Sequence, residues 1–398
     1  MATTTAPVPT KKTGLGTLTL LAVPLLLLAG VIALFIVTNG AGLNVAPVAP
    51  IETVQFDQTI LRPGTIELHL RNTSPQDLTI AQVKINDAIW PFSVSSEGSI
   101  PRLGSAVVTL DYPWVEAEAY AITLFSGSAI AFTTAIPVAT TTATASAGTL
   151  WSFTLIGLYV GIIPVVLGML WLPALRQCGP RAMTFLMALT AGLLIFLGID
   201  ATSEALELGG KLGGAFQGVG LVGIGIVATF LLLDAIGRRQ RGLGRGEAGQ
   251  RLTLATLIAT GIGLHNLGEG LAIGAAYSVG VAALGTFLVI GFIIQNITEG
   301  LGIIIPVLKD KPSLGSLALL GLIGGGPAIL GAWVGGLVSS PPLAVLFLAI
   351  GAGAVFEVVY EIGKLVRADL AKRPLPLTVF AGVTAGMLLL YVTGLVIK

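Results

Sequence analysis

Nine apolar stretches, each about 20 residues or longer, recur along this chain and leave little room for a water-soluble fold. A helix needs about 20 predominantly apolar residues to cross the hydrocarbon core of a bilayer. The composition agrees, because 54% of the 398 residues are hydrophobic and only 10% are charged. We predict an all-α polytopic membrane bundle in a lipid bilayer, with spans at residues 17–38, 151–173, 182–208, 214–236, 252–279, 281–308, 314–338, 342–365 and 376–397.

The first apolar stretch follows Lys11 and Lys12, a pattern shared by secretory signals and by retained membrane anchors. Its apolar run is longer than the core of about 7 to 15 residues found in signal peptides. We therefore predict that residues 1–44 form a cytoplasmic N-terminus and one N-terminal transmembrane helix.

Residues 45–137 differ from the rest of the chain, because apolar and polar residues alternate there and Pro and Gly interrupt the alternation. Stretches such as "TIELHLR" (65–71) and "AVVTLDY" (106–112) have the period of two that is typical of strands with one buried face. This region is predicted to form a small all-β, sandwich-like domain. The Thr- and Ala-rich segment 138–149 is predicted to be a linker to a helical domain at 150–398.

The 21 Lys and Arg residues predict an orientation, since loops that carry them stay on the cytoplasmic side. With the N-terminus inside, most of them fall in cytoplasmic segments, and Lys211 is the main exception among the short loops. The β-domain and the C-terminus are then extracytoplasmic, in a multi-pass protein of the cell membrane. A net charge of +1 gives no reason to expect a nucleic-acid partner.

Two related polar motifs interrupt the apolar stretches, "HNLGEG" at 265–270 and "QNITEG" at 295–300. Positions i and i+4 share one helix face, so His265 should lie beside Glu269, and Gln295 beside Glu299. Asn266 and Asn296 fall at the edge of the same polar faces. The short link near residue 280 makes the two helices antiparallel neighbours, and the likeness of their motifs is typical of an inverted repeat.

Two glutamates in a low-dielectric interior repel each other unless a cation compensates their charge. The sequence has no Lys, Arg or Asp between Arg251 and Lys309 that could do so. A divalent metal ion is the predicted cation, and nitrogen, carboxylate and amide ligands suit Zn²⁺, Fe²⁺, Mn²⁺ or Co²⁺ better than Cu⁺. The alternative is a purely structural role, in which the polar residues hydrogen-bond one helix to another.

At these motifs the chain resembles the ZIP family of zinc- and iron-type metal transporters, which have eight spans. The resemblance covers roughly residues 150–398, where the motifs fall in the fourth and fifth of eight predicted spans. It implies a ZIP-like eight-helix domain that carries divalent metal ions inward by alternating access, as substrates rather than as catalytic cofactors. It also implies a mid-membrane metal site formed by His265, Asn266, Glu269, Gln295, Asn296 and Glu299.

Two further pairs of acidic residues could lie on the ion's path, the first through the same resemblance and the second through its spacing alone. In "DATSEA" (200–205), Asp200 and Glu204 match the positions of a His and a Glu in the second family span, which implies a cation-attracting outer mouth. A solvated helix end is the alternative. Glu357 and Glu361 form another i, i+4 pair that could line an exit path, and the alternative for Glu361 is a salt bridge with Lys364.

The chain departs from the family pattern in the sixth span, where many members have Glu-Pro. Here Gly326 precedes Pro327, so a carboxylate that could bridge a second metal ion is missing. The predicted consequence is a single-ion or weaker site. A homodimer and a partner for the β-domain are both compatible with the sequence.

Two other functions are weighed against transport. His265 and Glu269 could hold the metal ion of an intramembrane hydrolase, but the chain has only two histidines and no H-E-x-x-H motif. No catalytic residues are therefore predicted, and an enzyme is not expected. The third alternative is a receptor that transports nothing and whose helices only carry the β-domain, which would leave the buried carboxylates without a purpose.

Overall fold

The computed structural model describes residues 15–38, 51–96, 98–241, 246–278, 282–338, 340–372 and 375–397. It comprises two compact units, Met1–Pro50 and Ile51–Lys398. Within the first unit the described part is the helix α1 (Leu15–Val37), which contains Pro24. Lys11 and Lys12, on which the predicted cytoplasmic placement of the N-terminus depends, lie outside the described residues.

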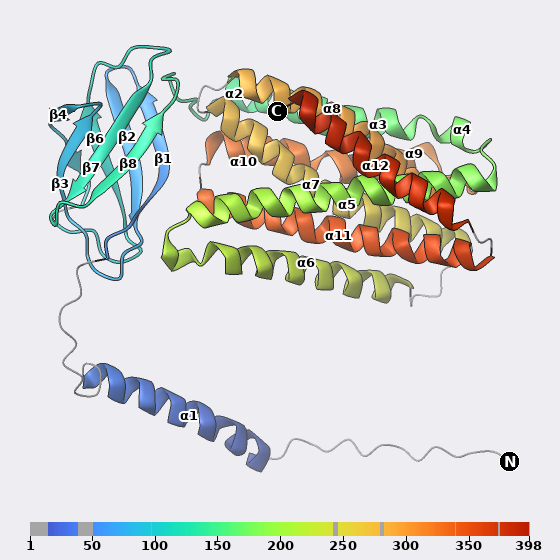
Figure 1. Cartoon of the computed structure of the whole chain (residues 1–398), viewed down its shortest axis with the longest axis horizontal. Helices are drawn as coiled ribbons and strands as arrows, with labels where there is room; N and C mark the ends of the chain where they lie inside the picture. The colour runs from blue at the N-terminus through green and yellow to red at the C-terminus, as the bar shows by residue number, and fades with distance from the viewer. Residues whose placement is uncertain are drawn as a thin grey trace. The chain divides into compact units, whose positions relative to one another are not determined.

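The predicted β-domain is an antiparallel sandwich of two four-stranded sheets (Figure 1). Alternating residues of each strand point into the core, as in β2, where Ile66, Leu68 and Leu70 are fully buried. One sheet has the order β1-β2-β6-β5 and the other β4-β3-β7-β8. The strands are β1 (Val54–Arg62), β2 (Thr65–Asn72), β3 (Ile80–Ile85), β4 (Ala88–Trp90), β5 (Ser93–Val94), β6 (Ser105–Asp111), β7 (Tyr120–Ser126) and β8 (Ala131–Ile136).

The segment 138–149, predicted to be a linker, makes more contacts than a free spacer would. Ala139 is fully buried in the core of the sandwich, and Thr142 exchanges two hydrogen bonds with the backbone of Leu61. The last residues of the segment belong to the first helix of the bundle, whose N-terminus is capped by the Ser146 hydroxyl.

Each of the nine predicted spans coincides with helix in the described part of the chain. Several are irregular, because the first after the β-domain contains a π-helical turn and the sixth is broken before Pro327. The elements are α2 (Ala147–Gly157), η1 (Leu158–Ile162), α3 (Ile163–Met169), α4 (Leu172–Leu175), α5 (Pro180–Lys211), η2 (Gly214–Phe216), α6 (Gly218–Arg241), α7 (Glu247–Ser278), α8 (Ala282–Ile304), η3 (Ile305–Val307), α9 (Leu314–Gly325), α10 (Pro327–Leu337), α11 (Pro341–Lys372) and α12 (Pro376–Ile397).

Among the described residues, six helical segments are long and apolar enough to cross a membrane. They are Ala147–Leu175, Pro180–Lys211, Gly214–Gln240, Leu288–Val307, Leu314–Leu337 and Pro341–Lys372. The described apolar parts of α1 and α12 are shorter, and α7, although 32 residues long, contains the polar motif at 265–270. The structure is thus mostly helical and typical of a multi-pass membrane protein, with a small antiparallel β region.

Successive long helices of the bundle run in opposite directions and define two ends. We call the end where α5, α7 and α12 begin the basic end, because Arg181, Arg238, Arg251, Lys309 and Lys372 lie there. At the opposite end, the loop between α5 and α6 contacts the β-domain, where the Gly213 amide donates to Oε1 of Gln55.

The helices pack in two groups. The motif group consists of α2, α3, α7, α8, α9 and α10, and the companion group consists of α5, α6, α11 and α12. Within each group backbones touch, since a methyl group on Gly270 would overlap the Ala328 carbonyl and one on Gly192 would overlap that of Val383. The largest interface between the groups lies between α7 and α11, where Gly351 faces His265. Figure 1 shows α5, α11 and α6 side by side.

Candidate metal site

The two polar motifs meet inside the motif group, on the facing sides of α7 and α8. His265, Glu269 and Glu299 are buried, and each offers a ligand atom that lies within 4.8 Å of the ligand atoms of the other two. This set could hold a metal ion. The structure brings residues of the two motifs together, while their role as metal ligands stays a prediction.

Glu269 is the centre of the hydrogen-bond network. Its Oε1 lies 3.2 Å from Nε2 of His265 and also accepts a hydrogen bond from Nε2 of Gln295. Its Oε2 accepts from Nδ2 of Asn296 at 2.9 Å. One carboxylate thus joins side chains from both helices; the i, i+4 spacing predicted its contact with His265, but not its bonds to Gln295 and Asn296.

Asn266 and Asn296 are fully buried, and each amide is held by a backbone carbonyl of another helix. Nδ2 of Asn266 donates to the Gly324 carbonyl at the end of α9, and Nδ2 of Asn296 donates to the Val160 carbonyl in η1, both at 2.9 Å. Because a carbonyl only accepts, the nitrogen end of each amide faces the backbone and Oδ1 faces away from it. Neither Oδ1 atom has a hydrogen-bond partner.

The carboxylate of Glu299 is buried in the same way as the Oδ1 atoms of Asn266 and Asn296. Both of its carboxylate oxygens are buried without a hydrogen-bond donor of normal geometry. Together with the Oδ1 atoms of Asn266 and Asn296, four buried oxygens at this site lack a donor. Buried oxygens of this kind cost about 1 to 3 kcal/mol each in proteins, so a cation that satisfied them would offset a large penalty.

The charges lead to the same conclusion. If both carboxylates are ionised, a neutral His265 leaves two uncompensated negative charges at a buried site, and a divalent ion cancels both.

No protein-family model matches this chain, and no curated protein is significantly similar to it in sequence. The chemistry of the site therefore has to be inferred from its own residues.

The predicted entrance residues lie on the companion group. Asp200 and Glu204 are both exposed on α5, separated by one helical turn, and Glu204 is close enough to His265 to act on it electrostatically. This exposed position suits either a cation-attracting mouth or a solvated helix end. The structure thus brings Glu204 toward the metal-site candidates but does not place it among them.

The predicted exit residues belong to a second buried cluster. Glu357 and Glu361 on α11 offer ligand atoms within 4.8 Å of one another and of Asp234 on α6. Arg238 pairs with Asp234 at 2.7 Å, and Lys364 pairs with Glu361, as one alternative predicted. Asp234 was missed from the sequence because its neighbour on α11 is more than a hundred residues away; its only local signal was Arg238 four positions later.

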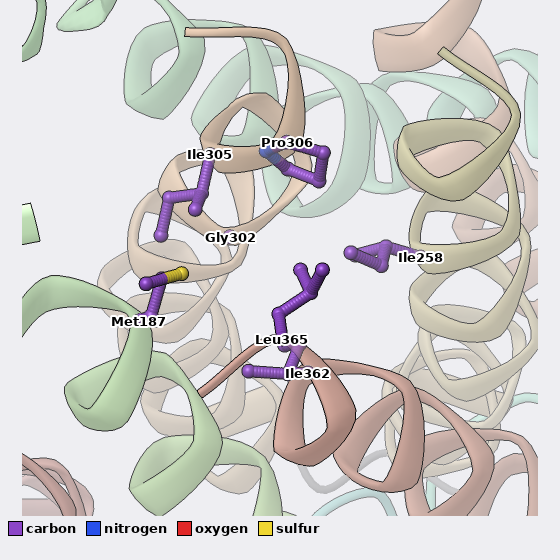
Figure 2. A pocket seen from close by; sticks show the side chains of 7 residues that line it. All are labelled: Met187, Ile258, Gly302, Ile305, Pro306, Ile362 and Leu365. Atoms are coloured by element: carbon purple, nitrogen blue, oxygen red, sulfur yellow. The ribbon is translucent and has the colours of Figure 1, made fainter. Parts of the chain in front are cut away.

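Toward the basic end, the site is closed by apolar side chains. Ile262 precedes the α7 motif by about one turn, Ile303 follows Glu299 by one turn, and both are fully buried. About 10 Å from His265 along α7, toward the basic end, the two groups of helices enclose a cavity of about 10 Å³. Figure 2 shows apolar side chains from α5, α7, η3 and α11 around it, together with Gly302 of α8: Met187, Ile258, Ile305, Pro306, Ile362 and Leu365. The cavity is too small and too apolar to hold an ordered water.

Proposed function

We propose that this protein transports divalent metal ions of the zinc, iron or manganese class across a membrane, as the resemblance of its helical domain to the ZIP family implies. The observation that carries the proposal is the set of four buried oxygens without donors on Asn266, Asn296 and Glu299. They lie beside an imidazole and a second carboxylate, on helices of a multi-pass bundle. Oxygen and nitrogen ligands of this kind suit borderline and fairly hard divalent ions.

A purely structural network explains these residues less well. Residues that join helices should satisfy one another, because an unpaired polar group costs more than the hydrogen bond gains. Here the asparagine N–H groups donate to backbone carbonyls and to Glu269, whereas the asparagine oxygens and the Glu299 carboxylate accept no hydrogen bond of normal geometry. A bound cation would interact with these oxygens, which a purely structural network leaves unpaired.

In the proposed mechanism, the ion is attracted by Asp200 and Glu204 at the end opposite the basic end, which is taken to be extracytoplasmic. It loses water as it enters the site, where His265, Glu269 and Glu299 replace hydration with charged and neutral ligands. Gln295 can join through its amide oxygen once the ion, rather than its amide nitrogen, faces Glu269. The ion thereby displaces the hydrogen bond that Gln295 makes to Glu269.

Release requires the apolar barrier at the basic end to open. Ile262, Ile303 and the side chains in Figure 2 offer no oxygen or nitrogen ligand to a hydrated divalent ion, so an ion does not pass while they remain packed. All six proposed ligands belong to the motif group, as do Ile262 and Ile303. Displacement of that group against the companion group would separate them from Met187, Ile362 and Leu365 and open a path between the two groups. Asp234, Glu357 and Glu361 then offer carboxylates on the way out, 9 to 15 Å from the level of His265 along α11.

The proposal is tested by metal influx into proteoliposomes that contain the full chain, with Zn²⁺, Fe²⁺, Mn²⁺ and Co²⁺ in turn. Glu299→Gln keeps the size of the side chain but removes its charge, and should reduce influx at least tenfold. Glu247→Gln is the matched control, because Glu247 is an exposed residue of α7 that pairs with Arg251 at the surface, and it should transport like wild type.

Influx of none of the four ions, or equal influx by Glu299→Gln and wild type, would overturn the assignment. Tight metal binding without influx would instead favour a receptor or an intramembrane hydrolase, and peptide or ester cleavage in the same vesicles would separate those two.

A further inference from the structure

Proline removes a backbone N–H, and in the first helix of the bundle this leaves one particular carbonyl without its usual donor. In an α-helix the carbonyl of residue 160 accepts from the N–H of residue 164. Residue 164 is proline, and the chain widens just before it into the π-helical turn η1, where the Ile163 amide reaches back to Leu158. The Val160 carbonyl accepts instead from the side-chain amide of Asn296 on α8.

The sixth helical segment contains a second break of the same kind. Pro327 lacks the N–H that the Ile323 carbonyl would otherwise accept, and α9 ends at Gly325 before α10 begins at Pro327. The Ile323 carbonyl packs directly on Gly263 of α7, whose missing side chain permits this approach. The next carbonyl, that of Gly324, accepts from the amide of Asn266, one turn along α7.

The two breaks also touch each other. A methyl group on Gly161 would overlap the carbonyl oxygen of Gly325, so the irregular turns of the two helices cross in backbone contact. Asn296 enters this crossing from α8 and Asn266 enters it from α7. The two asparagines occupy equivalent positions in the two motifs, so each motif is fixed by the break in one of the two crossing helices.

We infer that Pro164 and Pro327 are positioning residues for the metal ion, although neither side chain offers it a ligand atom. Each proline keeps a helix open so that a backbone carbonyl holds the nitrogen end of an asparagine amide. The nitrogen of Asn296 also donates to Oε2 of Glu269, and Oδ1 of each asparagine is left without a donor, as an oxygen that a cation can bind. This inference rests on the proposed function for its purpose, but the hydrogen-bond exchange behind it can be tested without any metal.

The first test compares wild type with Pro164→Ala in the full chain. The new N–H at position 164 should take the Val160 carbonyl and release Asn296. Zn²⁺ or Mn²⁺ affinity, measured by titration calorimetry, should then fall at least tenfold, while the metal-free protein is as stable as wild type or more so, because an interior proline is unfavourable in a helix. Pro376→Ala is the matched control, since Pro376 begins α12, where a missing N–H is not needed. Unchanged affinity of Pro164→Ala would overturn the inference.

A double-mutant cycle distinguishes positioning from a general effect on folding. If Pro164 acts through Asn296, then Pro164→Ala should lower metal affinity much less in an Asn296→Ala background than in wild type. Additive losses would overturn the inference. Pro327→Ala and Asn266→Ala give the equivalent cycle for the second break.

Failure of the proposed function gives a different result. If wild type binds neither Zn²⁺ nor Mn²⁺, the metal assignment fails, and an experimental structure of Pro164→Ala then tests the positioning alone. The inference predicts a helical hydrogen bond to the Val160 carbonyl and a displaced Asn296 amide. An amide still bound to Val160 would overturn it.

Discussion

Truncation to alanine should cost the fold more stability at Glu269 than at Glu299, although the two glutamates lie at the same site. Glu269 accepts hydrogen bonds from Gln295 and Asn296 and contacts His265, whereas Glu299 accepts none of normal geometry, although Gln295 and Asn266 lie close enough to interact with it. Glu269→Ala therefore removes one interaction from each of His265, Gln295 and Asn296, whereas Glu299→Ala removes no hydrogen bond of normal geometry. Both variants create a similar void, so the cost of the void cancels in the comparison.

The size of the difference follows from the number of lost interactions. Hydrogen bonds inside membrane bundles average about 0.6 kcal/mol, and typical protein hydrogen bonds about 1 kcal/mol. Three of them make metal-free Glu269→Ala less stable than Glu299→Ala by about 2 to 3 kcal/mol. The assay is thermal or denaturant unfolding of the purified full chain in the same detergent, with a chelator present.

Adding the ion should stabilise the two variants equally little, which leaves the difference between them unchanged. At an ion concentration 100 times its Kd, wild type gains about 2.7 kcal/mol of stability. If loss of either charged ligand raises Kd 100-fold, each variant gains only about 0.4 kcal/mol. Equal stability of the two metal-free variants would refute the hydrogen-bond reasoning, and an undiminished metal effect in either would refute its role as a ligand.

Three further predictions concern other parts of the chain. Arg251 lowers the pKa of Asp310 through a two-point ion pair. The pair therefore stabilises the fold fully above the ordinary pKa of 3.8, and this stabilisation is lost as the pH falls below it. Asp310→Asn should be less stable than wild type by about 1 kcal/mol at neutral pH and equally stable in acid, as measured by denaturant unfolding. Gly331→Ala would overlap the Leu267 carbonyl and should destabilise the bundle by about 1 to 3 kcal/mol, seen as a lower melting temperature. Tyr120→Phe leaves the Val115 amide without its acceptor and should destabilise the β-domain by about 1 to 3 kcal/mol in denaturant unfolding, whereas a loss below 0.5 kcal/mol would show that water replaces the hydroxyl.

The helical segments and the meeting of the two motifs could be predicted because both depend on local periodicity. Apolar length sets a span, and a four-residue spacing places His265 and Glu269 on one face whatever else the chain does. The role of Asn266 and Asn296 could not be predicted in this way. Their partners are the Gly324 and Val160 carbonyls, and which carbonyls a helix break turns toward a neighbour depends on how four helices cross.

The second carboxylate cluster shows the same limit. Glu357 and Glu361 were found through their spacing, but Asp234 joins them only because α6 packs on α11. The segment 138–149 was read from composition alone, which did not reveal that Ala139 completes the core of the sandwich. Pro164 was visible in the sequence as an interruption of an apolar stretch, and its consequence appears only when the side chain that replaces its N–H is known.

The placement of all six proposed ligands on adjacent helices of one group has a thermodynamic consequence for the carrier. A binding cage that travels intact presents the same coordination to the ion on both sides of the membrane, so its intrinsic affinity does not change during the cycle. Net movement would then follow the difference in free ion concentration, and accumulation against that difference would need a second ion, or a proton, bound in only one of the two positions.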